Sequence, residues 1–278
     1  MISRSQEILQ KAQKGGYAVG AFNTNNLEIT QAIIEAAEEL KAPVIIQTTP
    51  SAIEYAGLEE IYTIVWTAIV NSKIPAVLHL DHGKDYEIVK RAIDIGYPSV
   101  MIDASILNFE ENVHLVQRVV AYAHQHGVAV ESEIGAIGLG EEGVREGSTL
   151  YTDPAQAAEF VRLTKVDSLG VSIGNAHGAP AREKINIELL KKIKSKVDIP
   201  LVLHGCSGLS VTDLHQAIKN GICKINIDTN IRKASIDAMR EELKQNPNDY
   251  RAVLGEVKEK VKGVVKRYIK ILGSDSKG

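Results

Sequence analysis

Three histidines, each followed by glycine, are the residues of this chain best suited to bind a metal. His82, His177 and His204 lie in the segments AVLHLDHG, SLGVSIGNAHG and IPLVLHG, at the end of a short apolar run or just beyond it. Neutral imidazole is the commonest metal ligand in proteins, and three protein ligands with one open position are typical of catalytic zinc. Because the three occupy equivalent places in a repeating pattern, we predict that they form one site.

Acidic residues stand close to these histidines or at similar places in the pattern. Asp81 directly precedes His82, and a carboxylate beside a metal ligand can orient that ligand or exchange a proton with substrate. Asp103 and Glu133 end two further apolar runs. We interpret them as acids that support the ligands or as ligands of a second metal position, with a helix cap or a salt bridge as the structural alternative.

Two polar segments near the end of the chain predict a phosphate site. The first is GCSG at 205–208 and the second is NIDT at 226–229, each directly after an apolar run. Backbone amides, the hydroxyls of Ser207 and Thr229 and a helix N-terminus are suited to bind a dianion.

These residues must be positioned by eight apolar, β-rich runs that alternate with segments of helical period. The runs are 17–23, 42–48, 75–80, 97–103, 128–134, 166–173, 199–204 and 222–228. The helical segments are 27–40, 58–70, 86–95, 109–125, 153–163, 187–197, 211–220 and 229–243.

Eight such units in 278 residues predict an α/β protein, a single (β/α)₈ TIM barrel over residues 1–278. Active sites of this fold collect at the C-terminal ends of the strands, where the three histidines fall. A doubly wound open sheet is the alternative, but no GxGxxG motif follows the first run.

Two segments lie outside this repeat. The connection 135–152 follows the fifth run and contains five glycines and three glutamates, so we interpret it as a long mobile loop that covers the site. The basic stretch 256–270 alternates charge with Val and Ile. It predicts an amphipathic C-terminal helix with a solvated face, in preference to a polyanion-binding patch.

Composition narrows the class of protein. The chain is 44% hydrophobic and 24% charged with a net charge of -3, which is ordinary for a globular protein and does not favour a nucleic-acid partner. The two cysteines, Cys206 and Cys223, have no CxxC spacing. With no apolar stretch of membrane-spanning length and no signal-peptide core, we expect a cytoplasmic protein without a membrane partner.

The order of the motifs identifies a resemblance. HLDHG, SVMIDAS, ESEIG, GNAHG, LVLHGCSG and KINIDT occur in the order found in the class II, zinc-dependent ketose-bisphosphate aldolases. The resemblance extends from AFNTNNLE at 21–28 to the C-terminus and is closest to the branch that acts on fructose 1,6-bisphosphate and tagatose 1,6-bisphosphate. It implies reversible cleavage of a ketose 1,6-bisphosphate, with the fructose compound favoured, to dihydroxyacetone phosphate and glyceraldehyde 3-phosphate in glycolysis or related carbohydrate metabolism.

The resemblance also implies roles for the metal ligands and the acids. His82, His177 and His204 would hold a catalytic Zn²⁺ that stabilises the enediolate, and Asp103 and Glu133 would surround a second divalent metal position. Two further acids would move protons. Asp81 resembles the acid that protonates the aldehyde oxygen, and Glu141 resembles the base that removes a C3 proton, with Glu142 as its competitor.

Substrate contacts, ions and assembly are implied in the same way. A monovalent cation, Na⁺ or K⁺, would lie near the phosphate loops, and the assembly would be a homodimer or homotetramer. The residues implied to contact substrate or phosphate are Asn23, Gly178, Gly205, Ser207, Asn226, Asp228 and Thr229.

This chain departs from the family pattern at two places. A Tyr-Lys pair usually follows the His-Gly of GNAHG, whereas residues 179–182 read APAR, and we hypothesise that Arg182 contacts a phosphate instead. Leu139 replaces the second glycine of a Gly-Gly pair in the long loop.

Two other functions remain open from the sequence. Lys224 in the last run could form a Schiff base with a ketone or could belong to a buried ion pair. A phosphosugar-binding barrel without catalytic activity is the third reading, and the three histidines with Asp81 argue against it.

Overall fold

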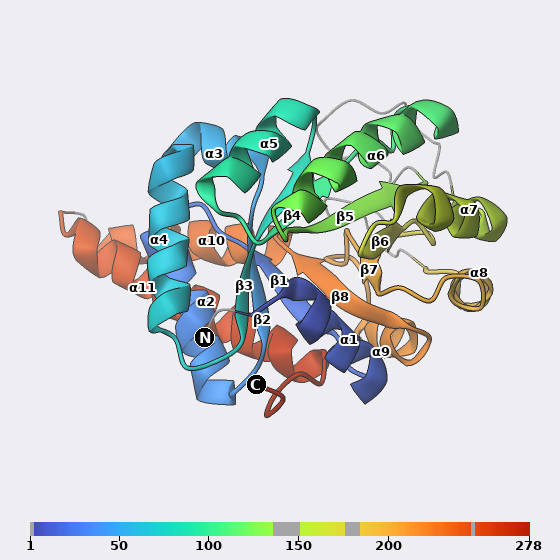
Figure 1. Ribbon diagram of the computed structural model, residues 1–278. Coiled ribbons are helices and arrows are strands. Elements are labelled where there is room, and N and C mark those ends of the chain that lie inside the picture. The colour runs from blue at the N-terminus through green and yellow to red at the C-terminus, as the bar shows by residue number, and fades with distance from the viewer. Residues whose placement is uncertain (1–2, 136–150, 176–183, 246–247) are drawn as a thin grey trace.

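Eight parallel strands form a closed barrel in chain order, with β8 paired to β1 (Figure 1). The computed structural model describes residues 3–135, 151–175, 184–245 and 248–278. This topology confirms the predicted TIM barrel. The strands are β1 Val19–Asn23, β2 Val44–Thr48, β3 Ala76–Gly83, β4 Ser99–Ile102, β5 Ala129–Ile134, β6 Ser168–Val171, β7 Leu201–Leu203 and β8 Ile222–Ile227.

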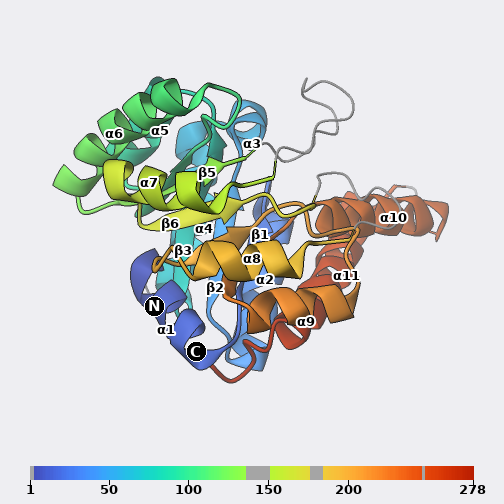
Figure 2. The same ribbon diagram turned by 90° about the vertical axis from the view of Figure 1, so that its right-hand side faces the viewer.

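Helices surround the barrel and connect its strands (Figures 1 and 2). Those in the described part of the chain are α1 Ser5–Gly15, α2 Leu27–Leu40, α3 Pro50–Ala56, α4 Leu58–Asn71, α5 Tyr86–Ile95, α6 Phe109–Gln125, α7 Pro154–Thr164, α8 Ile187–Lys194, α9 Val211–Lys219, α10 Thr229–Gln245 and α11 Tyr250–Ile271.

The predicted helices agree with the structure, and two others were not predicted. The helix α1 begins at Ser5, and its N-cap residue, Arg4, makes no capping hydrogen bond through its side chain, so the usual start signal is absent there. The helix α3 has only seven residues and begins with a Thr49 cap followed by proline. The C-terminal helix α11 begins at Tyr250, before the predicted start at 256, because Asp249 caps two backbone amides there.

The N-terminal end of the barrel is filled with apolar side chains and closed by α1. Ile8, Leu9 and Ala12 of this helix belong to a buried cluster separate from the main core, which lies between the strands and the outer helices. Side chains alternate between the two sides of a strand, so the cluster members on β1, β2 and β3 face the barrel lumen. The cluster also contains Tyr17, Val19, Ala21, Ile45, Val77 and Cys223.

The lumen becomes polar toward the C-terminal ends of the strands. Along β3, the inward positions read Val77, His79 and Asp81, and all three are buried. Along β5, Glu131 and Glu133 follow Ala129 at the same period of two, and both glutamates are 2% exposed. The period of the strand therefore places one charged layer in the middle of the barrel and a second at its mouth.

The helix α11 packs against α2 and presents its lysines to two glutamates. Glu35 lies 2.9 Å from Lys258 Nζ and 3.2 Å from Lys262 Nζ, and Glu39 pairs with Lys262 and Lys266. The apolar face of α11 is buried. The stretch 256–270 is therefore an amphipathic surface helix, as predicted, and acids neutralise part of its basic face.

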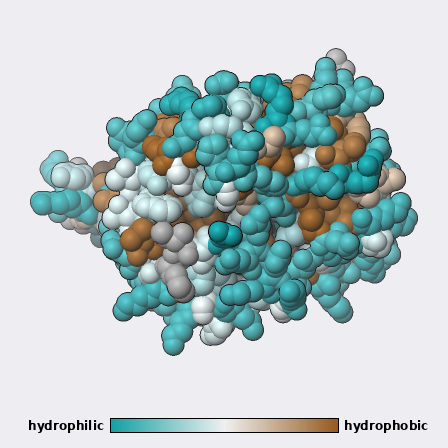
Figure 3. Space-filling model, viewed as in Figure 1, coloured by the Kyte–Doolittle hydropathy of each residue, from teal (hydrophilic) through white to brown (hydrophobic). Residues whose placement is uncertain are grey.

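The ends of α10 and α11 extend beyond the other helices in both ribbon views (Figures 1 and 2). The face shown in Figure 3 is largely hydrophilic, with apolar areas between its polar side chains. Among the helices that the structure describes, none combines the length and hydropathy needed to cross a bilayer.

The ion pairs between α2 and α11 predict a small, pH-dependent contribution to stability. Burial raises the pKa of Glu35, but hydrogen bonds from Lys258 and Lys262 lower it more, so the net pKa lies below the ordinary value of 4.5. The contribution is present above pH 4.5 and is lost as the pH falls through the lowered pKa. We expect Glu35→Gln to destabilise the protein at pH 7 by about 0.5 kcal/mol or less, and by less still in high salt.

Urea denaturation at pH 7 and at pH 4, in low and high salt, measures this effect. The exposed Glu54→Gln substitution on α3 is the control. Equal destabilisation by Glu35→Gln at both pH values would contradict the assignment.

Candidate active site

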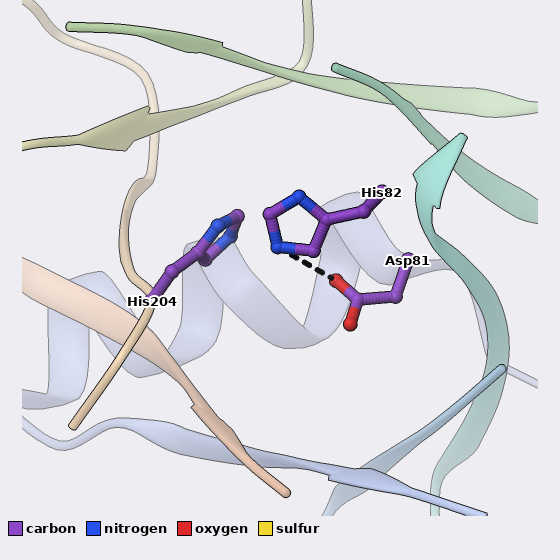
Figure 4. A group of neighbouring side chains, drawn as sticks. All are labelled: Asp81, His82 and His204. Atoms are coloured by element: carbon purple, nitrogen blue, oxygen red, sulfur yellow. Dashed lines mark ion pairs between the residues drawn. The ribbon is translucent and has the colours of Figure 1, made fainter. Parts of the chain in front are cut away.

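Asp81 and His82 are consecutive residues of β3, and both face the mouth of the barrel. Their side chains lie beside that of His204 (Figure 4), and one potential ligand atom from each of the three residues lies within 4.8 Å of the other two. Neighbouring side chains of a regular strand point to opposite faces. This strand must therefore break its alternation at the site.

The break is a β-bulge. His82 has a φ of 49°, in the left-handed region, and the pairing with β4 changes from Leu80↔Val100 to Gly83↔Ile102. The strand β3 thus has one residue more than β4 over this interval, which turns the side chain of His82 toward that of Asp81. The sequence predicted that the strand ends at residue 80, and the structure corrects this by placing both residues within β3.

Gly83 lets the bulge pack against its neighbours. A Cβ at this position would lie 2.6 Å from the carbonyl oxygen of Met101 and 2.7 Å from Val89 Cγ2. The carbonyl of Gly83 accepts a hydrogen bond of 2.9 Å from the Asp103 amide. The glycine therefore joins the bulge to the acid that contacts His82.

Three side-chain amides fix the carboxylate of Asp81. Asn23 Nδ2 and Gln47 Nε2 donate to Oδ2 at 3.2 and 3.1 Å, and Asn226 Nδ2 donates to Oδ1 at 3.0 Å. Burial raises the pKa of Asp81, but the neighbouring histidines His82 and His204 lower it more, so that the net pKa is lowered. These amides come from β1, β2 and β8, and together they fix the orientation of the Asp81 carboxylate.

Asp103 holds the ring of His82 from the side opposite Asp81. His82 Nδ1 lies 2.7 Å from Asp103 Oδ2, and its Nε2 lies 3.9 Å from Asp81 Oδ1. The other oxygen of Asp103 accepts bonds from the amide and the hydroxyl of Ser105. Burial raises the pKa of Asp103, but the bond to His82 and those to Ser105 outweigh it and lower the pKa.

His204 lies between two glutamates. It directly follows β7 and is fully buried, with Nε2 3.0 Å from Glu131 Oε1 and Nδ1 2.9 Å from Glu133 Oε2. Burial lowers the pKa of His204, but the two carboxylates raise it by more, so that the net pKa is about 10. Asn175 Nδ2 donates to the carbonyl of His204 at 2.8 Å and holds its backbone.

The two segments of the predicted phosphate site adjoin each other. Cys206, in the loop after β7, donates through Sγ to the carbonyl of Asn226 at the end of β8, over 3.0 Å. Asp228 pairs with Arg232 at 2.9 Å. Burial raises the pKa of Asp228, and Arg232 only partly offsets this. The site residues in these loops that are half-buried are Gly205, Ser207, Asp228 and Thr229.

Several predicted residues lie outside the described residues. They are His177, Gly178 and Arg182 in the segment after β6, and Glu141 with its competitor Glu142 in the long connection after β5. Their predicted roles stay predictions.

Lys224 belongs to a buried ion pair, which is one of the two roles that the sequence left open. Its Nζ lies 2.9 and 2.8 Å from the two carboxylate oxygens of Glu131. Sequence reasoning missed Glu131 as a residue of the site, although two acids spaced by two in VAVESEI indicate a shared face of one strand. Gln47 was missed because a single amide in an apolar run carries little signal.

The donor atoms fit a divalent metal. Two imidazoles and the carboxylate of Asp81 converge. Further carboxylates contact the rings, Asp103 at Nδ1 of His82, and Glu131 and Glu133 at the two nitrogens of His204. Metal-bound histidines commonly donate their other ring N–H to a carboxylate in this way. Asp103 and Glu133 lie around this group as predicted neighbours, and their role as ligands of a second metal position stays a prediction.

Comparison with known proteins places this arrangement in a family. The family model described as fructose-bisphosphate aldolase, class II, matches residues 3–277. The YdjI aldolase of Escherichia coli K12 is similar over 100% of this chain and 99% of its own, with 36% identity and a TM-score of 0.89. A putative fructose-1,6-bisphosphate aldolase of Coccidioides immitis is 32% identical over 99% of this chain and 97% of its own, with a TM-score of 0.92.

A third solved structure shares the fold at lower identity. The fructose-bisphosphate aldolase of Campylobacter jejuni is 24% identical over 100% of this chain and 97% of its own, with a TM-score of 0.84.

The packing around Gly83 predicts that a single methyl group there disturbs the site. We expect Gly83→Ala to destabilise the protein by about 1–3 kcal/mol, because the new Cβ must displace the Met101 carbonyl or the Val89 side chain. Urea denaturation measures the change in the free energy of unfolding.

Gly255→Ala is the matched control. A Cβ at Gly255, within α11, meets nothing within 4 Å. Alanine there should stabilise the helix by about 0.5–1 kcal/mol. If Gly83→Ala were neutral, the account of the bulge would be wrong.

Proposed function

Because this chain belongs to the class II fructose-bisphosphate aldolase family, we propose that it cleaves a ketose 1,6-bisphosphate into dihydroxyacetone phosphate and glyceraldehyde 3-phosphate, reversibly. The observation that carries the proposal is the juxtaposition of Asp81, held by three amides, with His82 and His204, each backed by a carboxylate.

His82 and His204 are the described residues that would hold a divalent ion, which we propose to be Zn²⁺, with His177 as the third predicted ligand. When bound, such an ion supplies Lewis-acid chemistry and polarises the ketone of the substrate. The carboxylates behind the two rings fix their orientation before an ion arrives.

In the proposed reaction, Asp81 exchanges a proton with the C4 hydroxyl of the substrate, which adjoins the C3–C4 bond that breaks. Its carboxylate is ionised at neutral pH because its pKa is lowered, so it can accept the proton of the C4 hydroxyl as the C3–C4 bond breaks. In the reverse direction it returns this proton to the aldehyde oxygen. Glu141 is proposed to exchange the proton at C3, where a base is needed for the second half of the reaction.

Polar groups around Asp81 would contact the substrate. Asn226 Oδ1 is buried and has no hydrogen-bond partner within the described structure, which leaves an acceptor for a substrate hydroxyl. The loops after β7 and β8, with Ser207 and Thr229, would bind one phosphate through amides and hydroxyls. Asn23, Gly178, Gly205, Asp228 and, as a hypothesis, Arg182 complete the proposed contacts, and Na⁺ or K⁺ is proposed near these loops.

We favour fructose 1,6-bisphosphate as the substrate, since the segment NIDTNIR at 226–232 resembles the fructose-specific pattern. Tagatose 1,6-bisphosphate is the alternative. A Schiff-base mechanism is disfavoured because Lys224 is 1% exposed and its Nζ is bound to both oxygens of Glu131. A homodimer or homotetramer stays a prediction, which light scattering on the purified protein can test.

Removing the proton carrier should stop turnover and leave the fold intact. We expect Asp81→Asn to reduce kcat by about 10²–10⁴-fold, because the amide cannot take the hydroxyl proton. A coupled cleavage assay measures this loss, and Asp237→Asn, at a surface ion pair of α10, is the control with unchanged kcat. Wild-type turnover by Asp81→Asn would remove Asp81 from the mechanism.

The same assay on both bisphosphates tests the metal and the substrate together. We expect a chelator to abolish cleavage and added Zn²⁺ to restore it, with fructose 1,6-bisphosphate cleaved faster than tagatose 1,6-bisphosphate. Full turnover by protein stripped of metal would contradict the proposed chemistry, and a preference for the tagatose compound would correct only the substrate.

A further inference from the structure

We propose that a hollow between the outer helices α9 and α11 binds an organic phosphate of about the size of a nucleotide. The phosphate groups would contact Arg267 and Lys270, and the rest of the ligand would lie against Val211 and Ile271. The inference does not depend on the proposed function, because none of these residues belongs to the candidate active site.

The hollow has the volume of a small-molecule site. The helices α9 and α11 pack against each other (Figure 2), and the space left between them has a volume of about 590 Å³. Small-molecule sites in proteins usually measure roughly 300–1,000 Å³. The residues that line the hollow are Val211 at the start of α9 and Gly263, Lys266, Arg267, Lys270 and Ile271 of α11. Because most of them are exposed, a ligand can enter directly from solvent.

Gly263 keeps the hollow open. A Cβ at this position would meet no neighbouring atom within 4 Å, so a side chain there would project into unfilled space. Glycine in the interior of a helix is less favourable than any other residue except proline. A larger residue at 263 would occupy the space beside Arg267, which follows one turn later on the same face of the helix.

Two cations of the hollow have no acidic partner. The lysines that precede them on α11 are each paired with a glutamate, Lys258 with Glu35, Lys260 with Glu256, and Lys262 and Lys266 with Glu39. In the described part of the chain, no carboxylate lies within 4.0 Å of Arg267 or Lys270. The positive charge of α11 is therefore neutralised along most of the helix but not in the hollow.

The helix dipole accounts for only one of these two cations. A cation stabilises the last turn of a helix, and the effect falls off beyond that turn. Lys270 lies in the last turn of α11, whereas Arg267 lies before it. A planar guanidinium can bind two phosphate oxygens at once, and the ammonium of Lys270, three residues further on the same face, adds a second charge.

The contacts between α9 and its surroundings fix the two ends of the hollow. Ser210 and Asp213 form a capping box, in which Ser210 Oγ accepts from the Asp213 amide at 3.1 Å and lies 2.6 Å from Asp213 Oδ2. The N-terminus of α9 is thus already capped, and the proposed contacts do not use it. His215 Nε2 donates to the carbonyl of Ile271 at 3.0 Å, which joins α9 to the end of α11.

The hollow offers apolar contacts besides its charges. Val211 is 41% exposed, and Ile271 is half-buried. A ligand with an apolar group beside its phosphates would cover both side chains, whereas an inorganic phosphate would leave them in water. ATP is therefore the probe, with pyrophosphate testing the charges alone and adenosine testing the apolar part alone.

Isothermal titration calorimetry of the whole chain with ATP, at physiological ionic strength, measures Kd. We expect Arg267→Gln/Lys270→Gln to weaken ATP binding by about tenfold or more, because the charge-assisted hydrogen bonds to phosphate are lost. Pyrophosphate and adenosine should each bind more weakly than ATP, since each makes only part of the contacts.

Gly263→Leu tests the shape of the hollow with its charges retained. The new side chain fills the space, so we expect ATP binding to weaken by about tenfold or more. Leucine favours a helix more than glycine does, and the midpoint of thermal unfolding should therefore rise. Loss of binding in a more stable protein separates occlusion of the hollow from damage to the fold.

Lys233→Gln/Lys260→Gln is the control with the same change in charge. It removes two exposed cations of α10 and α11, which pair with Asp237 and Glu256 outside the hollow. Its affinity for ATP should equal that of the wild type. An equal loss of affinity in this control would mark a response to net charge alone and would overturn the inference.

Ser207→Ala separates the hollow from the phosphate loops proposed at the mouth of the barrel. Loss of ATP binding in Ser207→Ala, with wild-type binding in the two variants of the hollow, would place the ATP in those loops and overturn the inference. Absence of ATP binding to the wild type up to about 1 mM would overturn it as well. Neither result would affect the proposed aldolase function, which is measured by cleavage.

Discussion

The site depends on a break in the alternation of one strand. Regular β3 geometry would turn either Asp81 or His82 away from the lumen, and the acid and the proposed ligand would then be on opposite sides of the barrel wall. The left-handed backbone of His82, with its φ of 49°, and the extra residue opposite β4 bring both inward. A backbone of this kind is strained for a residue with a side chain, so the surrounding packing must hold it.

The polar interior of the barrel is the second requirement of this site. Charged side chains in a closed lumen are costly unless each is paired, and here they are paired in layers. Lys224 and Glu131 neutralise each other below the site. At the mouth of the barrel, the side-chain amides of Asn23, Gln47 and Asn226 surround Asp81. The helix α1 closes the apolar end. Because every second residue of a strand points inward, the side chains in the lumen change from apolar at the end closed by α1 to charged at the mouth.

Much of this architecture was predictable from sequence, for identifiable reasons. Continuous apolar runs between helical segments predicted eight strands, because a parallel strand is buried on both faces. His82, His204 and Asp81 were predicted from their places at the ends of runs. The bulge was not, because it depends on the pairing of β3 with β4 and not on local sequence. Glu131 was overlooked because it pairs with Lys224, and the two residues are 93 positions apart in the chain.

The central claim is that one divalent ion is shared by His82 and His204 beside Asp81. Anomalous diffraction at the zinc edge, from crystals grown with Zn²⁺, tests it most directly. The account predicts one strong peak at about 2.0–2.1 Å from a ring nitrogen of His82 and from a ring nitrogen of His204. A peak bound to only one of these histidines, or to neither, would contradict it.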